Sequence, residues 1–338
     1  MRLALLLAAL GAIAGCAPAA SPVSAPAAPA TSAPAPSSAP TPEPPLELTL
    51  AIPAQSLSTF PILLGQETGI YSRRGINLSV VTMASNTAIA AVIAGSVDYA
   101  TPAGSIMRAI NQGAPLRVVA AVSDKSNHIL VVDPGAVREG KDLAGKTIAV
   151  NEIGGNTQLE AQAALQRFGL DRDSANYVGI LDNSQRLAAL QAGAAQAAIS
   201  NVPFNFVAEK MGLAVLVNFA EFYELPTGVL ATADQKIAAS PETVQRMVAA
   251  TLEALRYVRE QRGEAAQAIA RQYDMPLDQA TAAYDLSRDT WSATGRLSQA
   301  AYENSLDPAD LPNALPLDRV VDHRFVDSAT AATPPAGR

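Results

Sequence analysis

Segments typical of strands and of helices alternate along most of this chain, and the alternation occurs twice. The first series begins at residue 46 and ends near residue 122, and a second series of the same kind follows residue 133. Strands that alternate with short helices favour a parallel sheet covered by crossover helices. The sequence therefore predicts the α/β class, with two units that each hold a mostly parallel sheet flanked by helices.

The expected elements follow from hydrophobic periodicity and from the turn residues between them. In the first series we expect strands over 46–52, 76–82, 98–101 and 116–122, and helices over 60–69, 87–94 and 104–112. In the second we expect strands over 147–151, 177–181, 197–200 and 214–219, and helices over 157–168, 185–192 and 203–211. Mainly helical sequence follows residue 234, where Ser240 and Pro241 form a strong helix start. This tail most simply packs back on the first unit.

The first 45 residues are expected to lie outside the folded units. Arg2 precedes an apolar run over residues 3–15, which is too short to span a bilayer about 30 Å thick and is typical of a signal peptide. Small residues just before Cys16 resemble a bacterial lipobox, whose cysteine is acylated after cleavage; an ordinary signal peptide cleaved further on is the alternative. Residues 17–45 contain ten prolines and ten alanines and predict a disordered tether.

Charge and cysteine content exclude several classes of function. The chain carries a net charge of −7 and no run of Lys or Arg, which argues against nucleic acid as a partner. One cysteine and two histidines, His128 and His323, leave little for a metal site, and we expect neither a metal nor a cofactor. We expect an exported monomer, lipid-anchored to the outer face of the cytoplasmic membrane or in the periplasm.

The signals for an enzyme in this sequence are weak. Residues 140–147, GKDLAGKT, match the phosphate-loop pattern, but a strand rather than a helix is expected after them. No GxSxG elbow occurs, and His128 begins a strand-like run, HILVVD, which favours a loop or edge histidine. A Ser-His-Asp set remains open, because its members need only meet in space.

Uncharged polar residues gather where the predicted strands end and helices begin. Ligands of open α/β sheets lie outside the carboxyl ends of the strands, where helix N-termini present N–H donors and a partial positive charge. The loops of this kind are residues 56–60, 85–87, 101–105, 154–157, 182–184 and 200–203. The sequence predicts that they line one cleft.

Each loop taken singly has a simpler explanation, because Ser, Thr and Asn are also the usual N-caps. Gly154 and Gly155 before Asn156 favour the ligand role, since glycine lets a ligand approach the backbone closely. Phe60 and Phe204 each lie at the end of such a loop, either as flat walls of the site or as core residues.

Six stretches in this order resemble the solute-binding proteins of ABC importers for nitrate, sulfonates, taurine and thiamine-precursor pyrimidines. They are PILLGQETGIYSRRGINLSVV (61–81), AAVIAGSVDYATP (90–102), IMRAINQGAPLRVVAAV (106–122), DLAGKTIAVNEIGGNTQLE (142–160), RLAALQAGAAQAAIS (186–200) and LPLDRVVDHRFV (315–326). No single motif is diagnostic, but the ordered series is specific and covers nearly all of residues 46–327.

The resemblance implies a two-lobed periplasmic-binding-protein type II fold that closes on a ligand. Lobe one would comprise residues 46–133 and 221–327, lobe two residues 134–220, and a flexible tail residues 328–338. The ligand positions it implies are Ser58, Thr59, Phe60, Ser85, Asn86, Thr87, Thr101, Asn127, Gly155, Asn156, Thr157, Asn201 and Phe204. No Arg or Lys stands in these loops, which leaves sulfonates, aromatic heterocycles and other small polar solutes open besides inorganic anions.

The function expected from the resemblance is binding without a reaction. Closure around a small solute would deliver it to an ABC permease, with the N-terminal lipid keeping the binder at the membrane. Two alternatives stay open: an enzyme on the same fold, and a receptor that reports the ligand to a membrane sensor.

Overall fold

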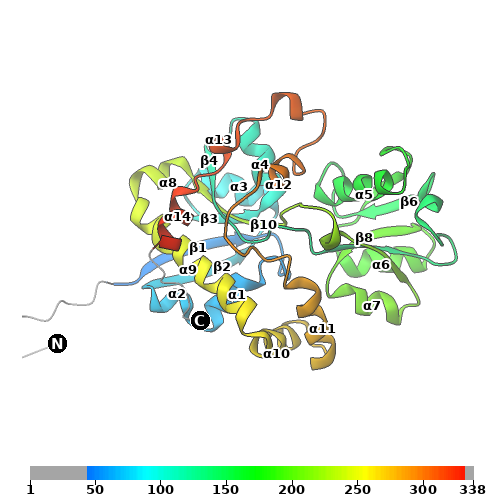
Figure 1. Ribbon diagram of the computed structural model, residues 1–338, viewed down its shortest axis with the longest axis horizontal. Coiled ribbons are helices and arrows are strands. Elements are labelled where there is room, and N and C mark those ends of the chain that lie inside the picture. Colours follow the sequence, from blue (N-terminus) through cyan, green and yellow to red (C-terminus); the bar gives the residue numbers. More distant parts are fainter. Residues whose placement is uncertain (1–43, 332–338) are drawn as a thin grey trace, which may run out of the picture. The chain divides into compact units, whose positions relative to one another are not determined.

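The computed structural model describes residues 44–331, and two five-stranded sheets flanked by helices make up most of this part (Figure 1). The α/β class expected from the sequence is therefore confirmed. Within residues 44–331, no helix combines the length and apolarity needed to cross a bilayer. The predicted signal peptide, Cys16 and nearly all of the predicted tether lie outside the described residues.

The first sheet has the strand order β2-β1-β3-β10-β4. Its strands are β1 (Leu46–Ile52), β2 (Ile76–Thr82), β3 (Tyr99–Pro102), β4 (Leu116–Ala121) and β10 (Gly228–Ala233). The helices between them are α1 (Phe60–Glu67), α2 (Ile70–Arg73), α3 (Ser85–Ile93) and α4 (Ala103–Asn111). β1 pairs with β2 in parallel along its full length. The central strand β10 is buried at every residue, because helices cover both faces of the sheet.

The second sheet has the order β7-β6-β8-β5-β9. Its strands are β5 (His128–Val132), β6 (Thr147–Val150), β7 (Asn176–Gly179), β8 (Ala197–Asn201) and β9 (Ala214–Asn218), and its helices are α5 (Asn156–Arg167), α6 (Asn183–Gln191) and α7 (Phe204–Lys210). The phosphate-loop match falls on a short 3₁₀ turn, Gly140–Leu143, and then on β6. Because the residues after Lys146 form a strand, no helix N-terminus is available there to hold phosphates, as the sequence indicated.

One strand in each sheet runs against the others, and each is the strand that enters from the other sheet. β10 is antiparallel to β3 and β4, and β5 is antiparallel to β8 and β9. Residues up to 133 were expected in lobe one, but β5 belongs to the second sheet. The apolar run of β5 would suit either sheet, so its sequence did not reveal the crossing. We call residues 44–121 and 228–331 the first lobe, 128–218 the second lobe, and 122–127 and 219–227 the crossing segments.

The C-terminal helices belong to the first lobe. They are α8 (Asp234–Ala239), α9 (Pro241–Glu260), α10 (Arg262–Tyr273), α11 (Leu277–Ser287), α12 (Gln299–Glu303), α13 (Leu317–Val320) and α14 (Arg324–Ala331). As expected, α9 begins at Pro241 and packs against α1, and α14 packs on α9. The tail predicted from residue 328 begins too early, because α14 continues to Ala331 and buries Ala329.

Phe60 is a core residue. It is 1% exposed, and its ring stacks on that of Trp291 with the centroids 5.9 Å apart. Trp291, also 1% exposed, donates its indole N–H to the carbonyl oxygen of Leu57 at 2.6 Å. Of the two roles left open by the sequence, wall of the site and core, Phe60 has the second.

Candidate ligand-binding site

The carboxyl ends of the parallel strands in both sheets lie beside the crossing segments. β4 runs in the direction of β1 and β3, since both β3 and β4 are antiparallel to β10, so the chain leaves the first sheet at its carboxyl edge. It enters the second sheet at His128, which pairs with Asn201 at the carboxyl end of β8. The polar loops predicted from the sequence follow these strand ends. The topology therefore brings the polar loops of the first sheet and those of the second sheet to the same region of the structure.

The two lobes touch at Asn156. Its side-chain oxygen accepts a hydrogen bond from Nη1 of Arg108 on α4 at 2.9 Å, and Arg108 also donates to the carbonyl oxygen of Ser305. A Cβ atom on Gly104, one turn before Arg108, would lie 1.8 Å from the same Asn156 oxygen. Asn156, predicted from its loop, therefore packs directly against the N-terminal half of α4.

A cavity of about 420 Å³ adjoins this contact. The first lobe lines it with Asn86, Ser105 and Arg108, among others, and the second lobe with Glu152, Gly154 and Gly155. The structure thus brings together the predicted residues Asn86 and Gly155. Ser85 and Thr87 share the first turn of α3 with Asn86, and Thr87 is exposed.

Arg108 lies on the helix α4, so the pattern of polar loops does not point to it. Burial lowers the pKa of its guanidinium, and Glu152, Asp307 and Asp310 act in the opposite direction. The sequence does contain one indication of its position. Gly104 and Arg108 are four residues apart, so they lie on the same face of α4, and Gly104 belongs to a predicted polar loop. A cation therefore does stand beside the predicted loops, although none stands in them.

Several predicted hydroxyl groups bond groups of the protein, in their own loops or, for Thr101, in a neighbouring strand. Thr157 donates to the side-chain oxygen of Asn151 at 2.7 Å and accepts from its backbone N–H. Ser58 bonds the hydroxyl of Ser56 at 2.6 Å, and Thr59 reaches the Ser56 carbonyl oxygen. Thr101 is fully buried and bonds the carbonyl oxygen of Ala51. The protons of Thr59, Thr101 and Thr157 are therefore donated within the protein, whereas either serine of the Ser56–Ser58 pair could be the donor.

The expected alternative, plain N-capping, holds for α6, where Asp182 accepts from the Gln185 N–H, and does not hold for α1, α3, α4 and α5. The N-cap of α1, Thr59, makes no capping bond with its side chain, and the N-caps of the other three are Ala84, Pro102 and Gly155, which have no side-chain acceptor. Four helix N-termini at the strand ends therefore keep first-turn N–H groups that their own N-cap side chains do not satisfy. Such groups favour a polar or anionic ligand.

Asn201 is held by a buried arginine. Arg186 on α6 donates to the carbonyl oxygens of Ile199 and Ile180 at 2.8 and 2.6 Å and to the side chain of Asn183. Asn183 in turn donates to Asn201 at 2.7 Å. Burial lowers the pKa of Arg186 to about 10. Four of its five donors are used by the second lobe itself, so Arg186 positions Asn201 through Asn183.

Asn127 contributes a donor without a protein partner. It lies in the first crossing segment, is 2% exposed, and its carbonyl oxygen accepts from the Val202 N–H. Its side-chain nitrogen has no hydrogen-bond partner among the described residues. A buried unsatisfied donor costs about 1–3 kcal/mol, a cost that a bound ligand would remove.

Phe204 lies at a different contact between the lobes. It lines a cavity of about 190 Å³ with Phe206 of α7 and with Tyr273 and Met275 at the end of α10. The residues that line this cavity do not include those of the 420 Å³ cavity. Phe204, the first residue of α7, therefore shares this cavity with residues at the end of α10 and lies away from the polar residues it was expected to accompany.

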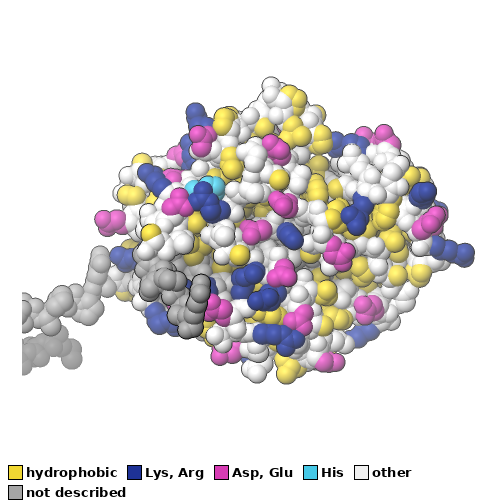
Figure 2. All heavy atoms as spheres, viewed as in Figure 1, with side chains coloured by type: hydrophobic (Ala, Val, Ile, Leu, Met, Phe, Trp, Pro, Cys, Tyr) yellow, Lys and Arg dark blue, Asp and Glu magenta, His cyan; other side chains and the backbone are white. Residues whose placement is uncertain are grey.

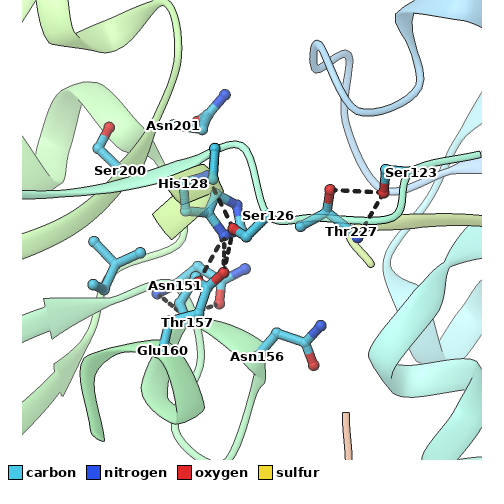
Figure 3. Close-up of polar contacts among 12 residues, drawn as sticks. Ser123, Ser126, His128, Asn151, Asn156, Thr157, Glu160, Ser200, Asn201 and Thr227 are labelled. Carbon is cyan, nitrogen blue, oxygen red and sulfur yellow. Dashed lines mark hydrogen bonds and ion pairs between the residues drawn. The ribbon is translucent and has the colours of Figure 1, made fainter. Parts of the chain in front are cut away.

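Three side chains near the start of β5 form a hydrogen-bonded cluster that sequence analysis did not predict (Figure 3). Glu160 of α5 is fully buried, and its two carboxylate oxygens lie 2.7 and 2.9 Å from Nδ1 of His128. The Ser126 hydroxyl donates to the same carboxylate and accepts from the His128 backbone N–H. His128 is therefore neither a loop nor an edge histidine, because β5 lies inside the sheet.

The crossing segments are joined to each other at Ser123 (Figure 3). Its hydroxyl oxygen accepts hydrogen bonds from the backbone N–H groups of Thr227 and Gly228, both at 2.9 Å, and Ser123 is fully buried. This oxygen holds the two crossing segments together, and any movement of one lobe relative to the other would have to bend these segments.

Replacing Ser123 by alanine is expected to lower the free energy of unfolding by about 1–3 kcal/mol, because it leaves the buried N–H of Gly228 and the partly buried N–H of Thr227 without this partner. Urea unfolding followed by circular dichroism measures the change. Ser184→Ala, at an exposed serine of α6, is the matched control and should leave stability unchanged. Equal stabilities for the two variants would show that the Ser123 hydroxyl does not hold the crossing.

Charges on the visible face of the molecule are mixed. Figure 2 shows Lys and Arg side chains interspersed with Asp and Glu, and no continuous basic surface is seen on this face.

Comparisons with known proteins agree with this architecture. A family model described as NMT1/THI5 like matches residues 57–265. A putative sulfonate ABC transporter periplasmic sulfonate-binding protein, SsuA from Methylobacillus flagellatus KT, is 19% identical, with a TM-score of 0.68 over 88% of this chain and 99% of that one. The periplasmic nitrate-binding protein NrtA from Synechocystis PCC 6803 is 14% identical, with a TM-score of 0.65 over 85% and 89%. The two-lobed type II fold is therefore confirmed.

Not every structural neighbour is a binding protein. The desulfurization enzyme DSZB is 17% identical, with a TM-score of 0.62 over 85% of this chain and 99% of that one. A search of curated proteins finds no match.

Proposed function

Because the chain belongs to the NMT1/THI5-like family, and its solved structural neighbours include binding proteins for sulfonate and nitrate, we propose that it is the extracytoplasmic solute-binding component of an ABC importer. The observation that carries this proposal is the contact between the lobes at Asn156, beside the N-termini of α3 and α5, whose N-cap residues make no side-chain capping bond. A site built from two lobes is suited to capture a solute and release it.

The proposed solute is small and polar or anionic, of the sulfonate, nitrate, bicarbonate or pyrimidine-precursor type. Arg108 alters the expectation drawn from the loops alone, since it adds a cation at the boundary between the lobes. Cations and N–H groups at helix ends favour negative charge in the same place. An anionic group on the solute is therefore the preferred candidate.

Capture would proceed by a shift between open and closed arrangements of the lobes. A solute that binds the closed form more tightly moves the population toward it, by no more than its differential affinity. A permease would recognise the closed form, and acylation of Cys16 with the proline-rich tether would keep the binder at the membrane. None of these steps makes or breaks a bond in the solute.

Native mass spectrometry of gently purified protein should detect a retained solute, and thermal-shift screening of sulfonates, nitrate, bicarbonate and pyrimidines should identify its class. Asn156→Ala and Thr87→Ala are each expected to weaken binding of the hit about tenfold, with little change in the melting temperature of the free protein. Asn176→Ala, at the amino end of β7, is the control. If both site variants bind as the parent does, the cleft is misplaced.

An enzyme on this fold is the second candidate, and the buried Glu160 beside His128 is the observation that favours it. The arrangement lacks an activated nucleophile, because Ser126 donates to Glu160 and not to the imidazole. Chemical conversion of a retained solute during incubation, followed by mass spectrometry, would favour the enzyme; recovery of the solute unchanged favours the binding protein.

A further inference from the structure

The two sheets hold an edge strand in equivalent positions. In each sheet the strand that runs against its neighbours lies fourth in the order, and the fifth strand is β4 in the first lobe and β9 in the second. The outer edge of such a strand presents backbone N–H and carbonyl groups that need hydrogen-bond partners. The outer edges of β4 and β9 can therefore be compared.

The chain itself covers the outer edge of β4. The N–H of Ala121 donates to the carbonyl oxygen of Gly295 at 2.7 Å. The carbonyl oxygen of Val118 accepts from the N–H of Asp322 at 2.9 Å. Val118 also forms a parallel bridge with Val321. Residues near 295 and 321 thus take the place of a sixth strand.

The outer edge of β9 has no such cover within residues 44–331. Apart from the ladder with β5, the backbone groups of residues 214–218 form no hydrogen bond in this part of the chain. The ladder also shifts by one residue, so Leu216 has no cross-strand partner. The strand reads AVLVN and lacks the Lys or Pro that often protect a sheet edge. This edge is therefore open to a further strand.

A groove of about 310 Å³ lies beside β9. Residues 215–218 line it in succession, although successive side chains of a strand point to opposite faces of the sheet. A groove that touches four residues in a row lies along the edge of the strand, and β5 occupies the inner edge. The groove therefore follows the outer edge. Its other walls are Arg167 and Phe168 at the end of α5 and Glu221 and Phe222 after β9.

Arg167 determines which charge the groove favours. Its guanidinium carbon lies 4.3 Å from the centroid of the Phe222 ring, and this contact holds the cation at the groove. The Arg167 side chain is exposed and forms no ion pair or hydrogen bond within the described residues. A guanidinium with free donors binds a carboxylate through two parallel hydrogen bonds. Glu221 is the opposing charge of the groove and is exposed on the turn after β9.

We propose that β9 binds an extended segment of another protein as an added strand along its outer edge. Main-chain hydrogen bonds to β9 supply the affinity, and the groove selects the side chains. Apolar side chains pack on Phe168 and Phe222, and an acidic side chain two residues away on the same face binds Arg167. This inference is independent of the solute site and goes beyond the proposed function.

Two occupants from the same protein fit less well. A second copy of β9 would bring the sequence AVLVN, which has no acidic residue to pair with Arg167. Residues 17–45 hold ten prolines, and proline has no N–H to donate to a strand edge. The occupant is therefore assigned to another protein.

The first test measures fluorescence anisotropy of a labelled peptide, Thr-Val-Thr-Asp-Thr-Val-Thr with both ends blocked, in the presence of the full chain. Its Val and Asp side chains share one face, and its sequence reads the same in both strand directions. We expect a dissociation constant below about 1 mM. A peptide with Lys in place of Asp should bind about fivefold more weakly. The fully N-methylated peptide should not bind, because it has no N–H to donate.

Matched variants test the role of the charge. Arg167→Gln should weaken binding of the Asp peptide about fivefold, whereas Glu221→Gln should bind it at least as tightly as the parent. Arg138→Gln, at another exposed arginine of the second lobe, is the control and should bind as the parent does. Absence of binding, equal binding of the Asp and Lys peptides, or unchanged binding by Arg167→Gln would overturn the proposal.

Hydrogen exchange followed by mass spectrometry locates the peptide without any variant. Saturating peptide should slow exchange at residues 214–218 and leave β7, the other edge strand of this sheet, unchanged. Slower exchange at β7 and not at β9, or equally at both, would overturn the proposal. Analytical ultracentrifugation of the free chain tests the second copy. A dimer that Val215→Lys abolishes would show that β9 pairs with itself, and the assigned occupant would then be wrong.

Discussion

Replacing Trp291 by alanine is expected to lower the free energy of unfolding of the first lobe by about 3–5 kcal/mol, the range found when large aromatic side chains are removed from cores. The indole is 1% exposed, stacks on Phe60, and meets the edge of Tyr284 with the centroids 5.4 Å apart. Its N–H also holds the carbonyl oxygen of Leu57, in the loop after β1. The variant therefore leaves a cavity and an unsatisfied carbonyl group together.

Trp291→Phe separates these two contributions. It keeps an aromatic ring but cannot donate to Leu57, so we expect a smaller loss, about 1–3 kcal/mol. Urea unfolding followed by far-ultraviolet circular dichroism measures the parent and both variants, because this signal does not depend on Trp291, the single tryptophan of the chain. If the alanine variant unfolds at the urea concentration of the parent, the cluster around Trp291 does not stabilise the lobe.

The regular elements were largely predictable from local sequence. The first two strands match their predicted ranges, Leu46–Ile52 and Ile76–Thr82, because alternating apolar residues and the turns beside them mark both ends. Helix ends differ by one or two residues, as at α3, which begins at Ser85 rather than Thr87. Fraying and capping determine the exact first and last residues of a helix, and the amino-acid composition of the segment predicts them poorly.

Pairings between distant residues could not be read from the sequence. The contact of Arg108 with Asn156 spans 48 positions, and that of His128 with Glu160 spans 32. Neither residue of the second pair lies in a predicted polar loop. Glu160 lies on a helix, where acidic residues are usually exposed, so the sequence gives no sign that it is buried. The direction of β5 was equally hidden, because an apolar strand looks the same in either sheet and in either direction.

The positions of the polar loops could be predicted from the sequence. Residues that bond their own loop could not be distinguished from residues that contact the other lobe. Ser58, Thr59 and Thr157 spend their hydroxyl groups within their own loops. Asn156 is different, because its partner lies in the other lobe. The same residue types serve both purposes, so the division depends on where the crossing segments bring the strand ends, and this is a property of the whole fold.

Gly104→Leu is expected to weaken solute binding by up to about a hundredfold, because overpacking a close contact costs about 1–3 kcal/mol. Even a Cβ atom at this position would lie 1.8 Å from the Asn156 side-chain oxygen and 2.4 Å from its Cγ. A leucine must displace Asn156 and so breaks its bond to Arg108. Separation of the lobes relieves the clash, so the free protein should unfold at nearly the parent temperature while its radius of gyration with solute stays that of the open form.

The double variant Gly104→Ala with Asn156→Ala tests the same contact from both sides. Gly104→Ala alone should already weaken binding, because its Cβ meets the Asn156 amide. In the double variant the obstructing amide is absent, so adding the methyl group at position 104 should cause no further loss beyond that of Asn156→Ala. Calorimetric affinities and small-angle scattering of all four proteins measure this coupling. Strictly additive losses would mean that α4 and Asn156 do not meet when the solute binds, and the proposed closure would then require a different surface.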